Sequence, residues 1–385
     1  MKQKIIYLDN AATTFPKPPG VCRETYRCMT QYCGNPGRGA HPVAMEAAEK
    51  VYECRSLLGD MFGSQPENVC FTLNTTYALN MAIKGMAKPN SHILIGNMDH
   101  NSTLRPVYAL KNAGIVDAEV FEAYSDTDNS TDRILSDIDK RVRKDTKMLI
   151  CSHSSNICSY TLPIEEIGRY CRDRGIIFIV DAAQSAGHTV IDMKKMNIDI
   201  LCMPAHKGLY GPQGCGIMIL GENAEIPETL IEGGNGVNSL EYTMNDEAPE
   251  KFEAGTVNTP AIAGLCEGIR FLNEYGIDNI SMHEKRLWNR TFDCLCRIPE
   301  VKIYAPAYSG PVFLFNVKGY TSDEVGSLLS EDGICVRTGY HCSALGHRTL
   351  GTRKEDFNGA VRVSFGFDNT DKDVDILCKK ISEIL

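Results

Sequence analysis

Short apolar runs alternate with longer segments of helical periodicity from about residue 43 to residue 220. Two runs are especially clear: Ile-Ile-Phe-Ile-Val-Asp, which ends at Asp181, and Asp-Ile-Leu-Cys-Met-Pro at 199–204. An almost wholly apolar run is typical of a strand that is buried on both faces, and alternation with helices is typical of βαβ units. The pattern predicts an α/β fold with a mainly parallel sheet flanked by helices.

The pattern changes after about residue 280, where shorter alternating segments appear, such as Gly-Pro-Val-Phe-Leu-Phe-Asn-Val at 310–317. A chain of 385 residues exceeds what a single core usually organises. We therefore expect a large domain at 15–265 and a smaller α+β domain formed by 1–14 and 266–385.

Two polar segments between the periodic ones are predicted to be irregular. Tyr-Ser-Asp-Thr-Asp-Asn-Ser-Thr-Asp at 124–132 predicts a surface loop. Glu-Gly-Gly-Asn-Gly at 232–236 predicts a flexible turn that can border a pocket. Neither has the composition of a domain linker.

The charge balance limits the kind of partner. The net charge of −9, without a basic tract, argues against nucleic acid or an anionic membrane surface as the main partner. The N-terminal segment lacks the apolar stretch of a signal peptide, and no run approaches the roughly 20 apolar residues of a membrane span. We expect small-molecule chemistry in the cytoplasm.

The sixteen cysteines are scattered, without CxxC pairs or Cys/His zinc spacing. This arrangement indicates neither a disulfide framework nor a metal site, and we expect no metal. Most of the cysteines, including Cys151, Cys202 and Cys215, are predicted to be buried, reduced thiols. Cys342 is the exception considered below.

Lys207 and Asp181 stand after the two clearest apolar runs. Both side chains are expected at strand carboxyl ends, where α/β folds bind ligands. A lysine there can form a Schiff base with pyridoxal 5'-phosphate (PLP), and a carboxylate facing the pyridine nitrogen keeps the ring an electron sink. Taken singly, each residue has an ordinary alternative: a helix-capping Asp and a solvated turn Lys.

A phosphate site is predicted where Asn74, Thr75 and Thr76 precede a segment of helical periodicity. A helix N-terminus offers free N–H groups to an anion, although the same residues fit a simple helix cap equally well. His206 could add a donor to the phosphate. His100 follows the strand-like Ile-Leu-Ile run at 93–95, where an imidazole could stack on a planar cofactor.

The chain resembles the class V, fold-type I PLP enzymes, and within them the cysteine desulfurase and selenocysteine lyase family, in its shorter-loop group II branch. The likeness extends over nearly the whole length. The motifs that carry it are Tyr-Leu-Asp-Asn-Ala-Ala-Thr-Thr (7–14), Asn-Thr-Thr (74–76), Asp-His (99–100), Val-Asp-Ala-Ala-Gln-Ser (180–185), His-Lys (206–207), Phe-Glu-Ala-Gly-Thr (252–256), Arg-Thr-Gly-Tyr-His-Cys (337–342) and Val-Arg-Val-Ser-Phe (361–365).

The resemblance implies roles for the matching cofactor residues. They are Lys207 as the Schiff-base lysine, Asp181 on the pyridine nitrogen, His100 on the ring face, Gln184 and Asn156 near the phenolic oxygen, and Thr75, Thr76 and His206 on the phosphate. Thr256 would reach the phosphate of a neighbouring subunit. The resemblance therefore implies a homodimer with shared active sites.

On the substrate side, the resemblance implies that Arg362 clamps the substrate carboxylate, with Asn156 and Ala11 as further contacts. A planar guanidinium suits this task because it donates two parallel hydrogen bonds. Cys342 is the implied sulfur acceptor, with its thiolate favoured by positive neighbours such as His341. The ordinary alternatives are a surface salt bridge for Arg362 and inert packing for Cys342.

The expected activity is conversion of L-cysteine to L-alanine, with sulfur retained on Cys342 as a persulfide and then passed to a protein acceptor. Pro204-Ala205 and Tyr340 depart from the family pattern, which leaves the substrate preference open. Three alternatives follow: a selenocysteine lyase, a PLP-dependent β-lyase or aminotransferase without persulfide chemistry, and a non-catalytic interaction protein with the same fold.

Overall fold

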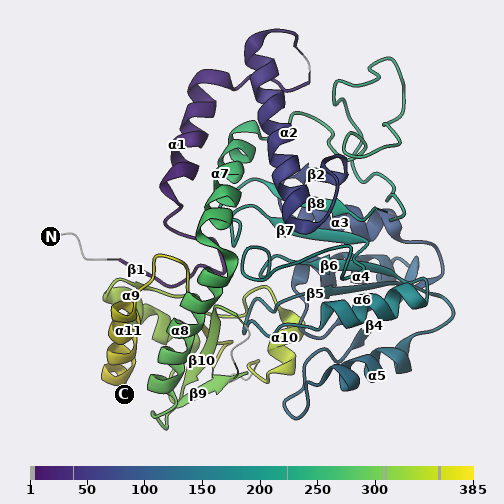
Figure 1. Ribbon diagram of the computed structural model, residues 1–385. Helices are drawn as coiled ribbons and strands as arrows, with labels where there is room; N and C mark the ends of the chain where they lie inside the picture. The colour runs from purple at the N-terminus through teal and green to yellow at the C-terminus, as the bar shows by residue number, and fades with distance from the viewer. Residues whose placement is uncertain (1–4, 38, 223, 306, 308–309, 354–356) are drawn as a thin grey trace.

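The computed structural model describes residues 5–37, 39–222, 224–305, 307, 310–353 and 357–385. Its centre is a seven-stranded sheet with the order β2-β8-β7-β6-β5-β3-β4 (Figure 1). The five strands from β7 to β4 pair in parallel. At one edge, β8 pairs antiparallel with β7, and β2 pairs antiparallel with β8. The strands are β2 (Val69–Thr72), β3 (Ser91–Gly96), β4 (Val116–Phe121), β5 (Thr146–Ser152), β6 (Ile177–Asp181), β7 (Ile200–Pro204) and β8 (Gly216–Leu220). The predicted mainly parallel sheet is confirmed.

Helices cover both faces of this sheet. Successive strand residues point to opposite faces, so Leu149 and Cys151 belong to the buried cluster that includes residues of α2, α5, α6 and α7, whereas Met148 and Ile150 belong to the cluster that includes residues of α3 and α4. This double covering explains why the central strands β6, β7 and β8 are almost wholly apolar, whereas the edge strand β4 carries polar positions that are exposed or half-buried. The helices, with the neighbouring π and 3₁₀ turns, are α1 (Pro19–Arg27), η1 (Cys28–Tyr32), α2 (Pro42–Phe62), η2 (Pro66–Asn68), α3 (Thr75–Met86), α4 (Asn101–Asn112), α5 (Thr131–Arg141), α6 (Ile164–Asp173) and α7 (Thr259–Tyr275).

The C-terminal part forms a second core. A three-stranded antiparallel sheet, β12-β10-β9, packs with α8, α9 and α11, at the lower left of Figure 1. Ile6 and Leu8 are buried in the same core, and β1 pairs in parallel with β11, so the N-terminal segment joins this part. The elements are β1 (Ile6–Tyr7), α8 (Ile277–Leu295), β9 (Val301–Tyr304), β10 (Val312–Val317), α9 (Ser322–Glu331), β11 (Ile334–Cys335), α10 (Ala344–Thr349), β12 (Val361–Ser364) and α11 (Asp371–Ile384).

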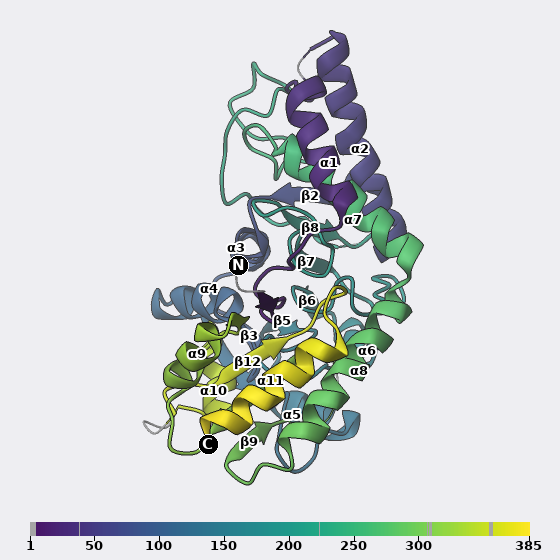
Figure 2. The same ribbon diagram turned by 90° about the vertical axis from the view of Figure 1, so that its left-hand side faces the viewer.

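The domain boundaries stay a prediction. The predicted limit at residue 265 lies inside α7, which ends at Tyr275, and α8 begins at Ile277 after the single residue Gly276 (φ 89°). Figure 2 shows these two helices in succession along one side of the molecule. Residues 1–4 of the predicted small domain are outside the described residues.

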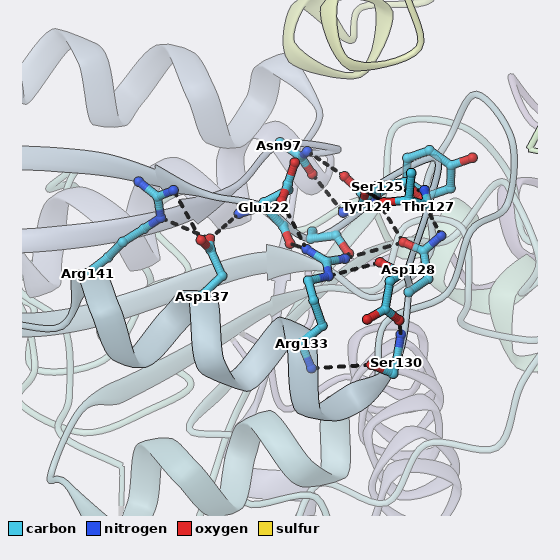
Figure 3. A network of polar contacts seen from close by, with 12 residues as sticks. Asn97, Glu122, Tyr124, Ser125, Thr127, Asp128, Ser130, Arg133, Asp137 and Arg141 are labelled. Atoms are coloured by element: carbon cyan, nitrogen blue, oxygen red, sulfur yellow. Dashed lines mark hydrogen bonds and ion pairs between the residues drawn. The ribbon is translucent and has the colours of Figure 1, made fainter.

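The predicted surface loop at 124–132 is confirmed in its middle and corrected at both ends. Residues 125–130 are irregular, but Tyr124 is buried, and α5 begins at Thr131 because the Ser130 hydroxyl accepts a hydrogen bond from the Arg133 amide (3.3 Å). Arg133 also donates to the carbonyl oxygens of residues 122, 123 and 128 (Figure 3). Hydrogen bonds from Arg133 therefore hold the loop against α5.

All sixteen cysteines lie in the described part of the chain and are free. Ten are buried, but Cys22, Cys33 and Cys296 are exposed, so the expectation of buried thiols holds for most and is wrong for these three. Among the described helices, none is long and apolar enough to cross a membrane.

Candidate active site

A cavity of about 120 Å³ opens at the carboxyl ends of β5, β6 and β7. Eight of the predicted site residues line it, together with six neighbours. The complete lining is Asn74, Thr75, Thr76, His100, Ser102, Ser152, Ser154, Asn156, Asp181, Ala183, Gln184, Pro204, His206 and Lys207. Residues from five separate chain segments thus meet because parallel strands end at one edge of the sheet.

A larger cavity of about 370 Å³ lies at the opposite end of the same strands, beside Ile177 and Asp199. Its lining includes Lys194 and Glu222, which are exposed and already pair with each other (3.4 Å). The smaller cavity is therefore the better candidate site, because its lysine and carboxylate are buried and face a common space.

Two glycines bring the halves of the cavity together. A Cβ atom on Gly187 (φ 84°) would lie 2.0 Å from the Gly208 carbonyl oxygen, and one on Gly208 would lie 2.1 Å from the Ala186 carbonyl oxygen. No side chain fits at either contact. The glycines thus let the turn that carries Lys207 lie directly against the segment that follows Asp181.

Burial changes the acid–base behaviour of the central pair. It lowers the pKa of the Lys207 amine to about 8, although the charge of Asp181 acts in the opposite direction. Burial also raises the pKa of Asp181, against a hydrogen bond from the Ala183 amide (2.9 Å) and the charge of Lys207. The result is an amine that is readily neutral and a carboxylate that is a strong hydrogen-bond acceptor.

The N-terminus of α3 forms the predicted phosphate end. Asn74 caps the helix by accepting a hydrogen bond from the Tyr77 amide (3.1 Å), and Thr75 and Thr76 form the first turn beside the cavity. The Nδ1 atom of His206 is buried and has no hydrogen-bond partner among the described residues. An unsatisfied imidazole nitrogen at a helix N-terminus fits an anion.

Lys17, which the sequence did not reveal, braces this end of the cavity. Its amine donates to the Thr14 hydroxyl (2.6 Å) and to the His206 carbonyl oxygen (2.7 Å). Burial lowers the pKa of Lys17 to about 8. The contact fixes the backbone immediately before Lys207.

His100 caps α4 and lines the cavity. Its Nδ1 atom accepts a hydrogen bond from the Ser102 amide (3.1 Å) and lies 2.7 Å from the Ser102 hydroxyl oxygen. Burial, together with the charge of Lys207, lowers the pKa of His100 to about 4. The ring is therefore neutral, and its proton lies on Nε2. Ser102 sets this orientation and was missed because a helix-start serine has no distinctive sequence signal.

Asp99 joins two strand ends below His100. Its carboxylate accepts hydrogen bonds from the amides of Gly96 (2.9 Å) and Ser152 (2.7 Å), at the ends of β3 and β5. Burial raises the pKa of Asp99 to about 7. The residue stabilises the edge of the sheet on which the site is built.

Arg362 enters from β12 and is almost completely buried. Its guanidinium donates to the Asp9 carboxylate (2.9 Å) and to the Asn156 carbonyl oxygen (2.9 Å), whereas Nε has no partner in the described structure. Gln184 donates to the Ala11 carbonyl oxygen (3.0 Å). Arg362 thus links the C-terminal part directly to the cavity wall at Asn156 and to the N-terminal segment at Asp9. The only sequence signal of Asp9 was its place in the motif at 7–14.

Cys342 is exposed on the turn between Gly339 and α10. The Asn101 amide donates to its carbonyl oxygen (2.8 Å), and the Asn156 side chain donates to the His341 carbonyl oxygen (2.7 Å). Burial lowers the pKa of Arg362, while Asp9 and Cys342 act in the opposite direction, so Cys342 is within electrostatic reach of the guanidinium. Asn156 is thus hydrogen-bonded both to the Arg362 guanidinium, through its carbonyl oxygen, and to the turn that carries Cys342, through its side chain.

The predicted positive charge on His341 is wrong. Its ring is buried, and burial together with the charge of Arg362 holds its pKa well below the usual value, so the ring is neutral.

Thr256 is not part of the cavity formed by this chain. It lies just before α7 and is exposed, as is the adjoining Gly255. Its predicted contact with a neighbouring subunit stays a prediction.

Comparison with known proteins identifies the family. The family model for aminotransferase class-V matches residues 6–377. The chain belongs to this family. Probable cysteine desulfurases of Pyrococcus abyssi and Methanothermobacter thermautotrophicus are 32% and 30% identical to it, over 100% and 98% of this chain and 95% and 94% of their own lengths. These matches confirm the predicted relation to cysteine desulfurases; the group II assignment stays a prediction.

Solved structures agree with the assignment. The apo structure of a cysteine desulfurase from Thermococcus onnurineus NA1 superposes with a TM-score of 0.90 at 31% identity, covering 99% of this chain and 94% of that one. An Escherichia coli cysteine desulfurase gives 0.86 at 23% identity over 98% and 94%, which supports the fold alone. The predicted fold-type I architecture is confirmed.

Class-V aminotransferases are PLP enzymes, so the predicted cofactor is confirmed, and the cavity fits it. Lys207 would carry the cofactor, and Asp181 would meet the ring nitrogen. The helix N-terminus at Thr75 and the unpartnered His206 Nδ1 atom would hold the phosphate. When bound, PLP supplies an electron sink for charge that develops on the substrate carbon atoms.

Proposed function

We propose that this class-V enzyme is a cysteine desulfurase that converts L-cysteine to L-alanine and retains the sulfur on Cys342. The observation that carries the proposal is the exposed Cys342 turn. It is hydrogen-bonded to Asn101 at the start of α4 and to Asn156 of the cavity wall, with Arg362 between the two parts. These backbone contacts between the turn and the cavity wall support the role of an exposed thiol that accepts the substrate sulfur.

Three side chains around the cavity have separate proposed roles in the reaction. Arg362 is the proposed clamp for the substrate carboxylate, because its buried guanidinium keeps Nε unpaired among the described residues. Lys207, whose pKa of about 8 makes the neutral amine accessible, is the proposed base for the substrate α-proton. His100, neutral and fixed by Ser102, would cover one face of the ring.

The sulfur step balances without an added redox partner. The Cys342 sulfur attacks the substrate sulfur, so that an S–S bond forms and the substrate carbon–sulfur bond breaks. The electron pair of the broken bond stays with the carbon skeleton, which takes up a proton and leaves as alanine. The enzyme thiol and cysteine together thus become an enzyme persulfide and alanine.

The assembly and partners are part of the same proposal. A homodimer is supported by the exposure of Thr256 and by the exposed apolar side chains Leu240 and Tyr242 on the segment that precedes it. A persulfide on an exposed residue suits transfer to a protein acceptor. The cytoplasmic location stays a prediction.

Anaerobic incubation of the PLP-loaded protein with L-cysteine tests the proposal. Mass spectrometry of the intact chain and quantification of alanine are expected to reveal alanine together with a one-sulfur adduct. Cys342→Ser is expected to abolish both. Cys296→Ser is the matched control, because Cys296 is also exposed but lies at the end of α8, and it is expected to behave as the unaltered protein.

Other products would identify the alternatives. Pyruvate without an adduct indicates a β-lyase, and activity of Cys342→Ser on L-selenocysteine alone indicates a selenocysteine lyase. Absence of any product from either amino acid, despite bound cofactor, contradicts the proposal.

A further inference from the structure

A row of hydrogen bonds runs beneath the Cys342 turn. The His341 and His347 rings stack with centroids 5.2 Å apart, and His341 Nδ1 lies 3.0 Å from His347 Nε2. At one end, His341 Nε2 lies 3.3 Å from the Arg337 carbonyl oxygen; at the other, His347 Nδ1 lies 2.6 Å from the Thr352 hydroxyl oxygen. We call these four residues the imidazole ladder.

The direction of every hydrogen bond in the ladder follows from its ends. Both rings are neutral, because burial lowers the pKa of His347 to about 4 and that of His341 well below its usual value. A carbonyl oxygen only accepts, so His341 Nε2 must donate to Arg337, and its Nδ1 must accept. His347 Nε2 therefore donates to His341, which leaves His347 Nδ1 as an acceptor. The single proton of the Thr352 hydroxyl then goes to Nδ1 (2.6 Å) rather than to the His347 carbonyl oxygen, which lies farther away (3.2 Å).

The ladder lies under an unfavourable backbone conformation. His341 (φ 46°) and Cys342 (φ 53°) are both left-handed, which residues other than glycine seldom adopt. Such a conformation persists only where the surroundings hold it in place. The ladder fixes the His341 side chain from below, and Asn101 and Asn156 hold the backbone from the cavity side.

We propose that His347 is a positioning residue for sulfur transfer, which holds the Cys342 turn in its left-handed conformation through the hydrogen bond from its Nε2 atom to His341. His347 is itself buried on α10, where Thr352 fixes its tautomer. The inference rests on the proposed function, in which Cys342 must meet the substrate sulfur. No contact of His347 with cofactor or substrate is required.

Two substitutions of His347 separate this hydrogen bond from the rest of the site. His347→Gln places an amide N–H near the former Nε2 position and keeps the donor to His341. His347→Asn places its amide near the former Nδ1 position and loses that donor. Both variants are polar and lack the ring, so loss of stacking affects them alike.

With L-cysteine, His347→Asn is expected to lower kcat about tenfold to a hundredfold, since a misplaced nucleophile costs that much, and to leave KM and cofactor absorbance unchanged. His347→Gln is expected to stay within about threefold of the unaltered enzyme. Hydrogen exchange of the segment 337–343 in the cofactor-free protein is expected to speed up in the Asn variant only.

Each other outcome has a definite meaning. The inference is overturned if both variants keep the kcat and the exchange rate of the unaltered enzyme. It is also overturned if kcat falls equally in both variants, because the effect then comes from the loss of ring packing. If the variants fail to fold, Thr352→Val removes the donor at the far end of the ladder and is expected to act in the same direction.

Thr349→Val is the matched control, because the Thr349 hydroxyl donates to the Asn97 carbonyl oxygen outside the ladder (3.3 Å). Equal effects of the two threonine variants overturn the inference. Failure of the unaltered enzyme to form alanine contradicts the proposed function, whereas the exchange experiment tests the ladder without turnover.

Discussion

Two polar networks of this protein form around loops and differ in almost every other respect. The two imidazole rings of the ladder beneath Cys342 are buried and neutral, and each ring nitrogen faces a single hydrogen-bond partner. The network of Arg133 closes the loop at 125–130 on the surface and uses one charged group with several acceptors (Figure 3). Loss of one member of a buried network leaves its partners without a hydrogen bond, whereas water can replace a lost hydrogen bond in an exposed network.

The largest expected effect comes from removing the central buried amine. Lys207→Ala is expected to lower alanine formation at least about a thousandfold, because the variant lacks both the attachment point of the cofactor and the proposed base. A steady-state assay measures alanine formation, and visible absorbance after PLP loading measures cofactor attachment. Lys194→Ala is the exposed control and is expected to change neither, since Lys194 pairs only with the surface residue Glu222 among the described residues.

The next effect concerns the buried guanidinium. Arg362→Lys is expected to weaken substrate binding by about 2 kcal/mol, or roughly thirtyfold in KM, because an ammonium cannot donate two parallel hydrogen bonds. KM for L-cysteine is the measurement.

Arg290→Lys is the matched surface control for Arg362. Arg290 makes two hydrogen bonds to Asp375 (2.7 and 2.8 Å) but lies on α8, exposed to solvent. It is expected to leave KM unchanged. A KM of Arg362→Lys equal to that of the unaltered enzyme would show that the carboxylate binds elsewhere.

A pH titration sharpens the contrast between buried and exposed groups. The pKa of Lys207 is lowered to about 8 from 10.5, so the folded apoprotein releases this proton before the unfolded chain does. Relative to Lys207→Met, the free energy of unfolding should therefore rise between pH 8 and 10.5. Below pH 8 the amine is charged in both states, so the buried charge lowers the free energy of unfolding by its full, constant amount.

The same titration governs loading of the cofactor. The rate of PLP attachment to the apoprotein, followed by absorbance, is expected to rise with pH through about 8, because only the neutral amine reacts. A rate that keeps rising to pH 10 with no change of slope would contradict the lowered pKa.

The smallest effect on activity belongs to the surface network. Arg133→Ala is expected to lower the free energy of unfolding by about 1 kcal/mol and to leave kcat within about twofold, because its partners regain water. Denaturant unfolding and the alanine assay measure the two quantities. Arg169→Ala, whose 3.5 Å contact with Glu165 is more exposed, is expected to change neither. A large loss of kcat in Arg133→Ala would show that the loop takes part in the reaction.

The sequence was sufficient where chemistry follows from local periodicity. Asp181 and Lys207 stand at the ends of apolar runs, and parallel strands that end together must place such residues at one edge. The motifs around them identified the family and the cofactor. Thr75 and His206 followed in the same way, because a helix start and a strand end are local features.

The tertiary structure alone decided which distant residues meet and how their protons are arranged. Asp9 and Arg362 are 353 positions apart, and their pairing depends on how the N-terminal segment joins the C-terminal core. The sequence suggested a cationic His341, but burial made it neutral and placed it under Cys342 with His347. Periodicity determines local elements, whereas burial and long-range contacts determine charge, and only the folded chain determines burial.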